Sequence, residues 1–330
     1  MSGVSKKTIE NSLSLKAYPS KSNVQRQLTL KNKEMKKILI TGCSSGFGHD
    51  AATYLASKGH HVIASMRNIN GKNAEAAQSL KDYARTNGYK IEVIEIDVTS
   101  DESVAEAAKK LPVVDVLINN AGLGFGGAVE AFSAQQCLDQ LDLNIVGTLR
   151  MAKIVLPGMR AQQSGLIIQV SSIAGRFAFP GFGVYHASKW GLEGLSESLR
   201  YEVSPHGIDV SLVEPGPFST NFFGNMIPAA SEEVSNAYQH VTQFNEGFGA
   251  NVMALFDDDN APTDPMEVVK TFEALINLPP GQRPLRTIAG LDFGAQAIND
   301  AVEPLRKAAL EGMEVAHLDG ASKEIKVQEG

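Results

Sequence analysis

The strongest constraint on the fold is a regular alternation of short apolar runs with amphipathic stretches, which begins at Met35. Lys37–Thr41 is a short apolar run that ends in a glycine-rich loop, as buried parallel strands do. The stretch from His49 to Lys58 places alanine and leucine at helical spacing and ends at Gly59. Such alternation predicts an α/β fold, a doubly wound (Rossmann-like), mainly parallel seven-stranded sheet with helices on both faces.

The remaining elements follow from the same periodicities. Six more strands are predicted, at His61–Met66, Lys90–Ile96, Val113–Ile118, Leu166–Val170, Ile208–Val213 and Leu285–Ala289. Further helices are predicted at Asn73–Asn87, from the capping box Thr99-x-x-Glu102 through Leu111, and at Ser133–Arg160, Tyr185–Val203, Glu232–Glu246 and Pro265–Leu278. Ligands of such folds bind beyond the carboxyl ends of the strands.

The domain organisation follows from composition. Residues 1–34 hold seven basic and two acidic residues with little apolar periodicity, which predicts a poorly ordered basic N-terminal extension. An organelle transit peptide is the alternative for this segment. Residues 35–330 are predicted to form a single domain. The alternation breaks at about 217–284, which we interpret as an insertion that caps the substrate side of the sheet edge rather than as a separate domain.

Composition also restricts partners and location. The net charge of −7 argues against nucleic acid as a partner. No apolar stretch reaches the ~20 residues that a membrane-spanning helix needs. The chain has two cysteines, so no disulfide framework is implied, and we expect a cytoplasmic protein.

The loop after the first strand has the spacing Gly42-x3-Gly46-x-Gly48. Glycines between a strand and a helix let the backbone approach a pyrophosphate, which the helix N-terminus attracts. A simple tight turn is the alternative, but the strand–loop–helix context favours a dinucleotide site.

The end of the second strand bears on the choice of cofactor. It reads Ala64-Ser65-Met66-Arg67, with no carboxylate to bind the adenosine ribose. Because an arginine can pair with a 2′-phosphate, NADP(H) is the preferred prediction and NAD(H) remains possible. Arg67 could instead be a solvated charge.

Tyr185 and Lys189 are four residues apart at the start of a predicted helix, so they share one face. Lowering a tyrosine pKa from ~10 to ~7 requires about 4 kcal/mol in favour of the phenolate. One ammonium at ~4 Å in an effective dielectric near 20 supplies about that much. The alternative is an exposed amphipathic pair without a catalytic role, which the polar residues expected at the same edge of the sheet disfavour.

Other polar residues are expected at the same edge of the sheet. Ser171 and Ser172 end one apolar strand, and Asn119-Asn-Ala-Gly122 ends another. A hydroxyl there could hydrogen-bond a substrate oxygen as charge develops on it. Asn144 stands in an otherwise apolar helical segment, where its amide either serves the site or only fixes a neighbouring backbone.

Together these segments resemble the short-chain dehydrogenase/reductase superfamily, in its single-domain branch. The resemblance covers Lys36 to Asn221 closely and extends more loosely to Gly290. Each motif is short, but their ordered conjunction is specific. The matching residues are Thr41-Gly42-x3-Gly46-x-Gly48, Asp97, Asn119-Asn120-Ala121-Gly122, Asn144, Ser172, Tyr185-x3-Lys189 and Pro215-Gly216 followed by Thr220.

The resemblance implies a role for each residue. Tyr185 would be the general acid and base, Lys189 would lower its pKa and hold the nicotinamide ribose, and Ser172 would position the substrate oxygen. Asn144 would hold a water that links Lys189 to solvent. The implied catalytic set is Asn144, Ser172, Tyr185 and Lys189. The implied cofactor-binding set is Thr41, Gly42, Ser44, Ser45, Gly46, Phe47, Gly48, Arg67, Asp97, Val98, Asn119, Ala121, Gly122, Tyr185, Lys189, Pro215, Gly216 and Thr220.

The main functional prediction is an NAD(P)(H)-dependent oxidoreductase that interconverts a ketone or aldehyde and its alcohol. The alternatives are a catalytically silent cofactor sensor or scaffold, and an epimerase or dehydratase acting on a nucleotide-sugar. The segment Ala187–Arg200 looks like that of hydroxysteroid- and retinol-dehydrogenase-like members, which favours a lipophilic alcohol. Family likeness also implies a homodimer or homotetramer formed through the helices at Ser133–Arg160 and Tyr185–Val203.

Three further features of the sequence each allow two interpretations. The aromatic residues of 217–284, with Phe177, Phe179 and Phe182, would line an apolar pocket or form the small core of the insertion. Cys43 would be a small residue in a tight loop, or a redox-sensitive thiol near a helix N-terminus. Asp257–Asp259 would be a solvated acidic loop rather than a cation site, so no metal is predicted.

Overall fold

The computed structural model describes residues 34–258 and 260–322. The prediction of a poorly ordered extension therefore falls outside the described residues, apart from Glu34. The chain divides into two units between Met35 and Lys36, and everything that follows concerns the second unit.

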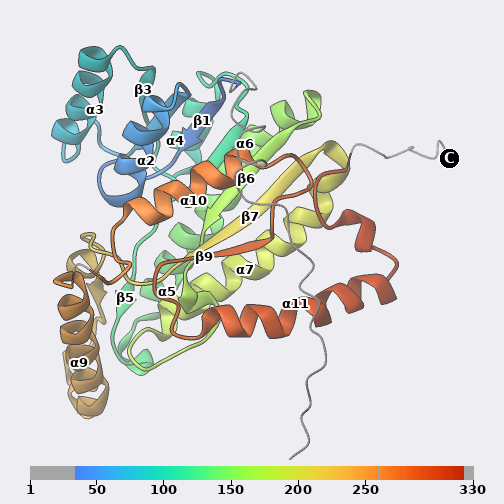
Figure 1. Cartoon of the computed structure of the whole chain (residues 1–330). Coiled ribbons are helices and arrows are strands. Elements are labelled where there is room, and N and C mark those ends of the chain that lie inside the picture. The colour runs from blue at the N-terminus through green and yellow to red at the C-terminus, as the bar shows by residue number, and fades with distance from the viewer. Residues whose placement is uncertain (1–33, 259, 323–330) are drawn as a thin grey trace, which may run out of the picture. The chain divides into compact units, whose positions relative to one another are not determined.

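A seven-stranded parallel sheet forms the centre of this unit, with the order β3-β2-β1-β4-β6-β7-β9, and helices cover both of its faces (Figure 1). This confirms the predicted α/β doubly wound fold. The strands are β1 (Lys37–Ile40), β2 (His61–Met66), β3 (Ile91–Glu95), β4 (Val116–Asn119), β6 (Gly165–Val170), β7 (Ile208–Pro215) and β9 (Arg286–Ala289). A small second sheet, which the sequence did not predict, pairs β5 (Phe125–Gly126) with β8 (Ile227–Pro228).

Alternate side chains of each strand point to opposite faces of the sheet and pack into two separate hydrophobic cores. Ile38 and Ile40 pack under one layer of helices, while Leu39 between them packs under the other. The first layer holds α2 (Gly46–Ser57), α3 (Ala74–Asn87) and α10 (Met266–Asn277). The second holds α4 (Asp101–Ala108), α6 (Gly147–Ala161) and α7 (Gly183–Val203). Burial on both faces explains why the strands are continuously apolar.

The helix predicted over Ser133–Arg160 is confirmed as a continuous helical stretch, but a π-helical turn, which was not predicted, interrupts its regular α-helical geometry. It consists of α5 (Ala134–Leu141), a π-helical turn η2 (Asp142–Val146) and α6. Within the turn, the buried Asn144 side chain bonds the backbone of Leu123 and the hydroxyl of Ser188. Tertiary hydrogen bonds therefore accompany a local widening that helical periodicity does not reveal.

Two other helix predictions need correction. Thr99 does not cap α4, because its N–H and hydroxyl bond the carboxylate of Asp97. Ser100 is the N-cap instead and accepts a hydrogen bond from the backbone of Ser103. The helix predicted over Glu232–Glu246 is broken at Tyr238, whose backbone is not helical, into α8 (Glu232–Ala237) and α9 (Gln239–Phe256).

The segment predicted as a cap has two parts. Its C-terminal helix α10 supplies Val268 and Phe272 to the core above the sheet, so it belongs to the main body of the fold. The remainder, with β8, α8 and α9, lies beside the carboxyl edge of the sheet. A further helix, α11 (Ala295–Gly312), was not predicted. No helix among the described residues combines the length and apolar content needed to cross a membrane.

Candidate active site

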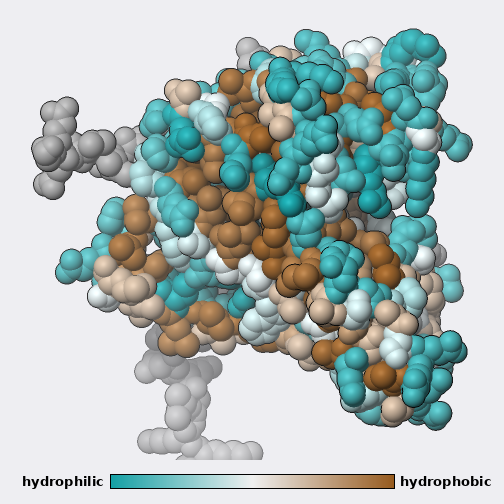
Figure 2. All heavy atoms as spheres, turned by 180° about the vertical axis from the view of Figure 1, so that it is seen from behind, coloured by the Kyte–Doolittle hydropathy of each residue, from teal (hydrophilic) through white to brown (hydrophobic). Residues whose placement is uncertain are grey.

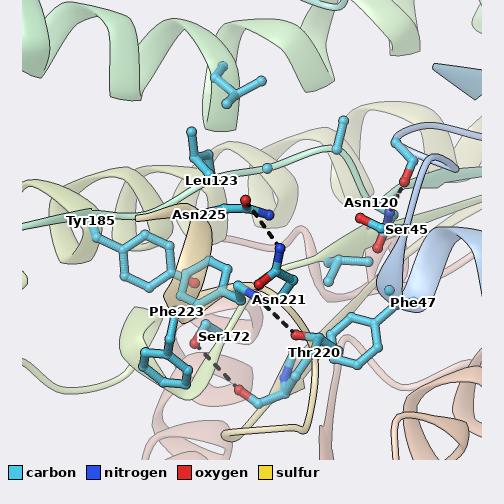
Figure 3. A pocket seen from close by; sticks show the side chains of 18 of the residues that line it. Ser45, Phe47, Asn120, Leu123, Ser172, Tyr185, Thr220, Asn221, Phe223 and Asn225 are labelled. Carbon is cyan, nitrogen blue, oxygen red and sulfur yellow. Dashed lines mark hydrogen bonds between the residues drawn. The ribbon is translucent and has the colours of Figure 1, made fainter. Parts of the chain in front are cut away.

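One cavity of about 730 Å³ lies at the carboxyl edge of the sheet. The glycine loop lines one end, and Tyr185 and Ser172 line the other (Figure 3). Of the predicted site residues it is lined by Gly42, Ser44, Ser45, Gly46, Phe47, Arg67, Asp97, Val98, Ala121, Gly122, Ser172, Tyr185, Lys189, Pro215, Gly216 and Thr220. Thr41, Gly48, Asn119 and Asn144 are close by but do not line it.

The glycine loop has a shape that other residues would not permit. Gly42 and Gly46 have φ values of +73° and +54°, in the left-handed region. A Cβ at Gly48 would lie 2.4 Å from the carbonyl oxygen of Gly42. Helix α2 begins at Gly46, and its N-cap Ser45 makes no side-chain capping bond. The first turn of α2 therefore presents backbone N–H groups at the cavity, an arrangement suited to an anion.

Thr41 and Asn120 fix this loop against the end of β4. The hydroxyl of Thr41 accepts hydrogen bonds from the backbone N–H groups of Asn120 and Ala121, both at 3.0 Å. The amide of Asn120 donates to the carbonyls of Thr41 and Gly42, at 2.9 and 3.2 Å. Thr41 thus supports the loop rather than facing the cavity, and Asn120, absent from the predicted set, both supports and lines it.

The part of the cavity next to the end of β2 carries positive charge. Arg67 lines the cavity, as does Lys72 five residues later, which the sequence analysis missed. Both side chains are exposed, and Asp97 lines the same cavity. Because Lys72 follows the strand in an irregular turn, no periodicity marks it as a site residue.

Tyr185 and Ser172 form the polar end of the cavity. The hydroxyl of Tyr185 bonds that of Ser172. Ser172 also accepts a hydrogen bond from the backbone N–H of Ala174 at 3.1 Å and donates to the carbonyl of Pro215 at 3.4 Å. Because both residues line the cavity, a substrate oxygen bound between them could contact both hydroxyls.

The ionisation of Tyr185 differs from the sequence-based expectation. Burial raises the pKa of the Tyr185 phenol to about 12, and its hydrogen bond to Ser172 opposes this rise only in part. The Lys189 ammonium nitrogen lies 5.7 Å from the centre of the Tyr185 ring and donates to the carbonyl of Val170 at 2.9 Å. The protein groups alone therefore keep the phenol protonated, because desolvation outweighs the hydrogen bond to Ser172.

Lys189 is itself strongly affected by burial. Its side chain is only 6% exposed, which disfavours the charged form and lowers its pKa to about 8. The nearby carboxylate of Glu193 partly offsets this lowering. At neutral pH the ammonium is thus retained, with little margin.

Asn144 chiefly fixes backbone and helix contacts. Its amide oxygen accepts from the N–H of Leu123 at 3.2 Å, and its amide nitrogen donates to the carbonyl of Leu123 at 3.1 Å and to Ser188 at 2.9 Å. Gln140, which the sequence analysis did not single out, bonds the same strand at Leu123 and Phe125. These contacts show that Asn144 fixes the backbone at Leu123, and the catalytic role implied for it stays a prediction.

Aromatic side chains cover the substrate side of the cavity. We call Phe179, Phe182, Phe222, Phe223 and Phe248 the aromatic wall, since all five line the cavity and pack around Tyr185. Figure 3 shows Phe223 beside Tyr185 and Ser172, and Asn221 and Asn225 between them and the loop residues Ser45 and Asn120. In the insertion, Val234, Tyr238 and Val241 pack with Ala128 and Ala131 of the main body in a separate small cluster. Several of the predicted aromatic residues thus line the cavity, whereas the small cluster of the insertion is shared with the main body.

The two remaining motifs have simpler explanations. Cys43 is fully buried, its thiol bonds the carbonyl of Ile40, and burial raises its pKa to about 12, so it is not an activated thiol. Asp259 lies outside the described residues. Within them, no group of three or more histidine, cysteine, aspartate or glutamate side chains is placed to hold a metal ion.

Comparison with known proteins places this architecture in a family. The short chain dehydrogenase family matches residues 36–230. The chain belongs to this family. It is 36% identical to human 17-beta-hydroxysteroid dehydrogenase type 1 over 73% of the chain and 74% of that protein. A crystal structure of a short-chain dehydrogenase from Streptomyces avermitilis matches with a TM-score of 0.68 and 32% identity, over 86% of this chain and 98% of that one.

Two other curated relatives are similar over shorter spans. The chain is 42% identical to a 3-ketodihydrosphingosine reductase of Bacteroides thetaiotaomicron over 57% of its length, and 39% identical to human retinol dehydrogenase 8 over 59%. These matches cover 66% and 63% of the two relatives. A serine dehydrogenase complexed with NADP+ is 25% identical, with a TM-score of 0.63 over 77% of this chain and 94% of that one.

Proposed function

We propose that this chain is an NAD(P)(H)-dependent oxidoreductase that interconverts a lipophilic ketone or aldehyde and its alcohol. The observation that carries the proposal is the single cavity lined by the glycine loop at one end and by Tyr185 and Ser172 at the other. Such a cavity can hold a dinucleotide and a substrate in contact, and family membership agrees with that use.

The residues at the loop end fit the dinucleotide. Left-handed Gly42 and Gly46 and the open first turn of α2 leave room and N–H donors for a pyrophosphate. When bound, the nicotinamide would supply or accept a hydride. Thr220, Pro215 and Gly216 line the stretch between the loop and Tyr185, where they would orient the nicotinamide toward the substrate.

In the proposed reaction Tyr185 donates the proton to the substrate oxygen or takes it up. With a pKa raised to about 12, its phenol is protonated at neutral pH and can donate to the oxygen of a carbonyl that Ser172 also bonds. The positive charge of Lys189 would stabilise the phenolate that remains. In alcohol oxidation the same phenol must first lose its proton, which burial disfavours.

Two basic residues support a preference for NADP(H). Arg67 and Lys72 line the end of the cavity where a 2′-phosphate would lie, and the strand end offers no carboxylate for an adenosine ribose. The serine dehydrogenase neighbour is a complex with NADP+. NAD(H) would bind without this charge pairing and remains the weaker alternative.

The aromatic wall supports a lipophilic substrate. Its five rings enclose the space in front of Tyr185, where they would bury an apolar skeleton. The names of three relatives refer to a ketodihydrosphingosine, retinol and a hydroxysteroid. A bulky, largely apolar ketone or secondary alcohol is the class that we propose.

The decisive experiment follows NADPH and NADH oxidation with ketones of graded size, in the wild type and in Tyr185→Phe. We expect turnover of bulky apolar ketones with NADPH, and at least a ~100-fold loss in the variant with cofactor binding retained. Unchanged turnover in Tyr185→Phe would contradict the assigned proton donor.

A cofactor sensor or scaffold is the second candidate function. The family fold alone is compatible with it, but a sensor has no need for the hydroxyl pair of Ser172 and Tyr185 together with the buried Lys189. Tight NADPH binding with no turnover of any carbonyl in the panel would favour the sensor.

We also propose that the protein forms a homodimer or homotetramer. Large apolar side chains remain exposed on neighbouring elements, at Leu138 on α5, Val146 and Leu149 at η2 and α6, and Trp190 on α7. Figure 2 shows hydrophobic residues gathered across the middle of the face that it displays. Light scattering should give a multiple of the chain mass, and Leu149→Glu should reduce it. A monomeric wild type would contradict this proposal.

A further inference from the structure

His186 stands beside the proposed proton donor but faces away from the cavity. It follows Tyr185 on α7 and is 3% exposed, and it does not line the cavity that Tyr185 lines. Successive residues of a helix point about 100° apart, so the two rings leave α7 in different directions. His186 is directed at the segment 174–182, which joins β6 to α7.

Both ring nitrogens of His186 bond the backbone of this segment. Nδ1 is 2.9 Å from the carbonyl oxygen of Ala174, and Nε2 is 3.1 Å from the backbone nitrogen of Phe179. A carbonyl can only accept a hydrogen bond and a backbone N–H can only donate one. The two partners therefore specify a neutral imidazole with its proton on Nδ1. Burial, which lowers the pKa of His186, agrees with this neutral form.

Phe179 connects His186 to the substrate side of the cavity. Its ring lies edge-on to the His186 ring, with centroids 4.5 Å apart. It also contacts Phe182 at 5.1 Å and Phe248 at 5.3 Å, both members of the aromatic wall. His186 on α7, Phe179 in the segment 174–182 and Phe248 on α9 come from three separate parts of the chain. Because Phe179 contacts both of the other rings, its position affects how the aromatic wall packs.

We propose that His186 is a positioning residue for substrate specificity, which sets the shape of the aromatic wall by fixing the backbone of Phe179. The inference rests on the proposed function, because it takes the aromatic wall as the substrate-binding surface. It predicts that loss of the two hydrogen bonds loosens Phe179 and weakens the selection of bulky apolar substrates over small carbonyls, while proton transfer by Tyr185 continues.

The first test compares His186→Leu, which removes both hydrogen bonds, with His186→Gln, whose amide can both donate and accept. Ala187→Ser, an exposed change next to His186, is the matched control. We expect the ratio of kcat/KM for a bulky apolar ketone to that for a small ketone to fall about ten-fold in His186→Leu, mainly through KM. It should be largely restored in His186→Gln. An unchanged ratio would overturn the proposal.

A double-mutant cycle separates this role from general destabilisation. Phe179→Leu should lower the same ratio, and the pair with His186→Leu should lower it little further, because both changes act on one contact. Additive losses, or an equal loss for every substrate, would overturn the proposal.

Hydrogen exchange supplies a readout that does not need turnover. The Phe179 amide, which donates to His186, should exchange faster in His186→Leu and return toward the wild-type rate in His186→Gln. An unchanged exchange rate of the Phe179 amide would contradict the proposal that His186 fixes this backbone, even if the enzyme is active. Failure of the proposed function would instead appear as a wild type that oxidises no NADPH with any ketone.

Discussion

The two ends of the cavity are built in opposite ways. At the cofactor end the backbone makes the surface, and Thr41 and Asn120 lock the glycine loop to the end of β4 through hydrogen bonds of 2.9–3.2 Å. At the substrate end, side chains make the surface, and the rings of the aromatic wall meet with centroids 5.1 to 6.0 Å apart. The first end has little freedom to adapt, whereas rings can repack.

This contrast suggests different sensitivity to mutation. A change that displaces the backbone at the cofactor end should weaken cofactor binding and therefore lower activity with every substrate. A change to one ring at the substrate end should alter some substrates and spare others, because neighbouring rings fill part of the space.

The largest effect is expected from Gly48→Ala. The new Cβ would lie 2.4 Å from the carbonyl oxygen of Gly42 and 2.6 Å from the amide nitrogen of Asn120, so the loop must move. We expect NADPH affinity to fall by about 100-fold, measured by titration calorimetry. Gly194→Ala on α7, where a Cβ meets nothing within 4 Å, should leave affinity unchanged. Normal binding in Gly48→Ala would break the contrast between the two ends.

The next effect concerns Lys189, which lies between the two ends. Its pKa is lowered to about 8, so the ammonium is present below that pH and is lost above it. The kcat/KM for carbonyl reduction should therefore decline as pH rises through about 8. In Lys189→Met activity should be low, by about 10- to 100-fold, and without this decline. A wild-type profile that stays flat up to pH 10 would contradict the role assigned to the ammonium.

A smaller effect is expected from Arg67→Gln. If Arg67 pairs with a 2′-phosphate, the variant should raise KM for NADPH by about ten-fold and leave that for NADH unchanged. Because Arg67 is exposed, the difference should shrink at high salt. Arg85→Gln, an exposed arginine on α3 paired with Asp82, serves as the control. Equal losses with both cofactors would show that Arg67 does not read the phosphate.

The smallest effect is expected from Phe248→Leu in the aromatic wall. A leucine keeps part of the apolar contact, so kcat/KM for a bulky ketone should fall only about three- to five-fold. NADPH affinity and the turnover of a small ketone should change less. A loss as large as that of Gly48→Ala would mean that the substrate end is as rigid as the cofactor end.

Much of the fold could be predicted because its signals are local. The apolar strands, the glycine loop and the four-residue interval from Tyr185 to Lys189 can be read from neighbouring residues. Thr99 shows where local reading fails: its hydroxyl bonds Asp97, and Ser100 caps α4 instead. Nor does periodicity mark the π-helical turn, which contains Asn144 and its tertiary hydrogen bonds to Leu123 and Ser188.

The sequence by itself determined the parallel sheet, the place of the site at its carboxyl edge, and the residue types found there. Only the tertiary structure decided which aromatic residues line the cavity, because Phe179 and Phe248 are far apart in the chain. It also decided how deeply Tyr185 is buried, and this burial raises the pKa of its phenol in the protein alone. The physical reason is that a pKa depends on how completely packing removes water, and this is a property of the assembled site rather than of any short motif.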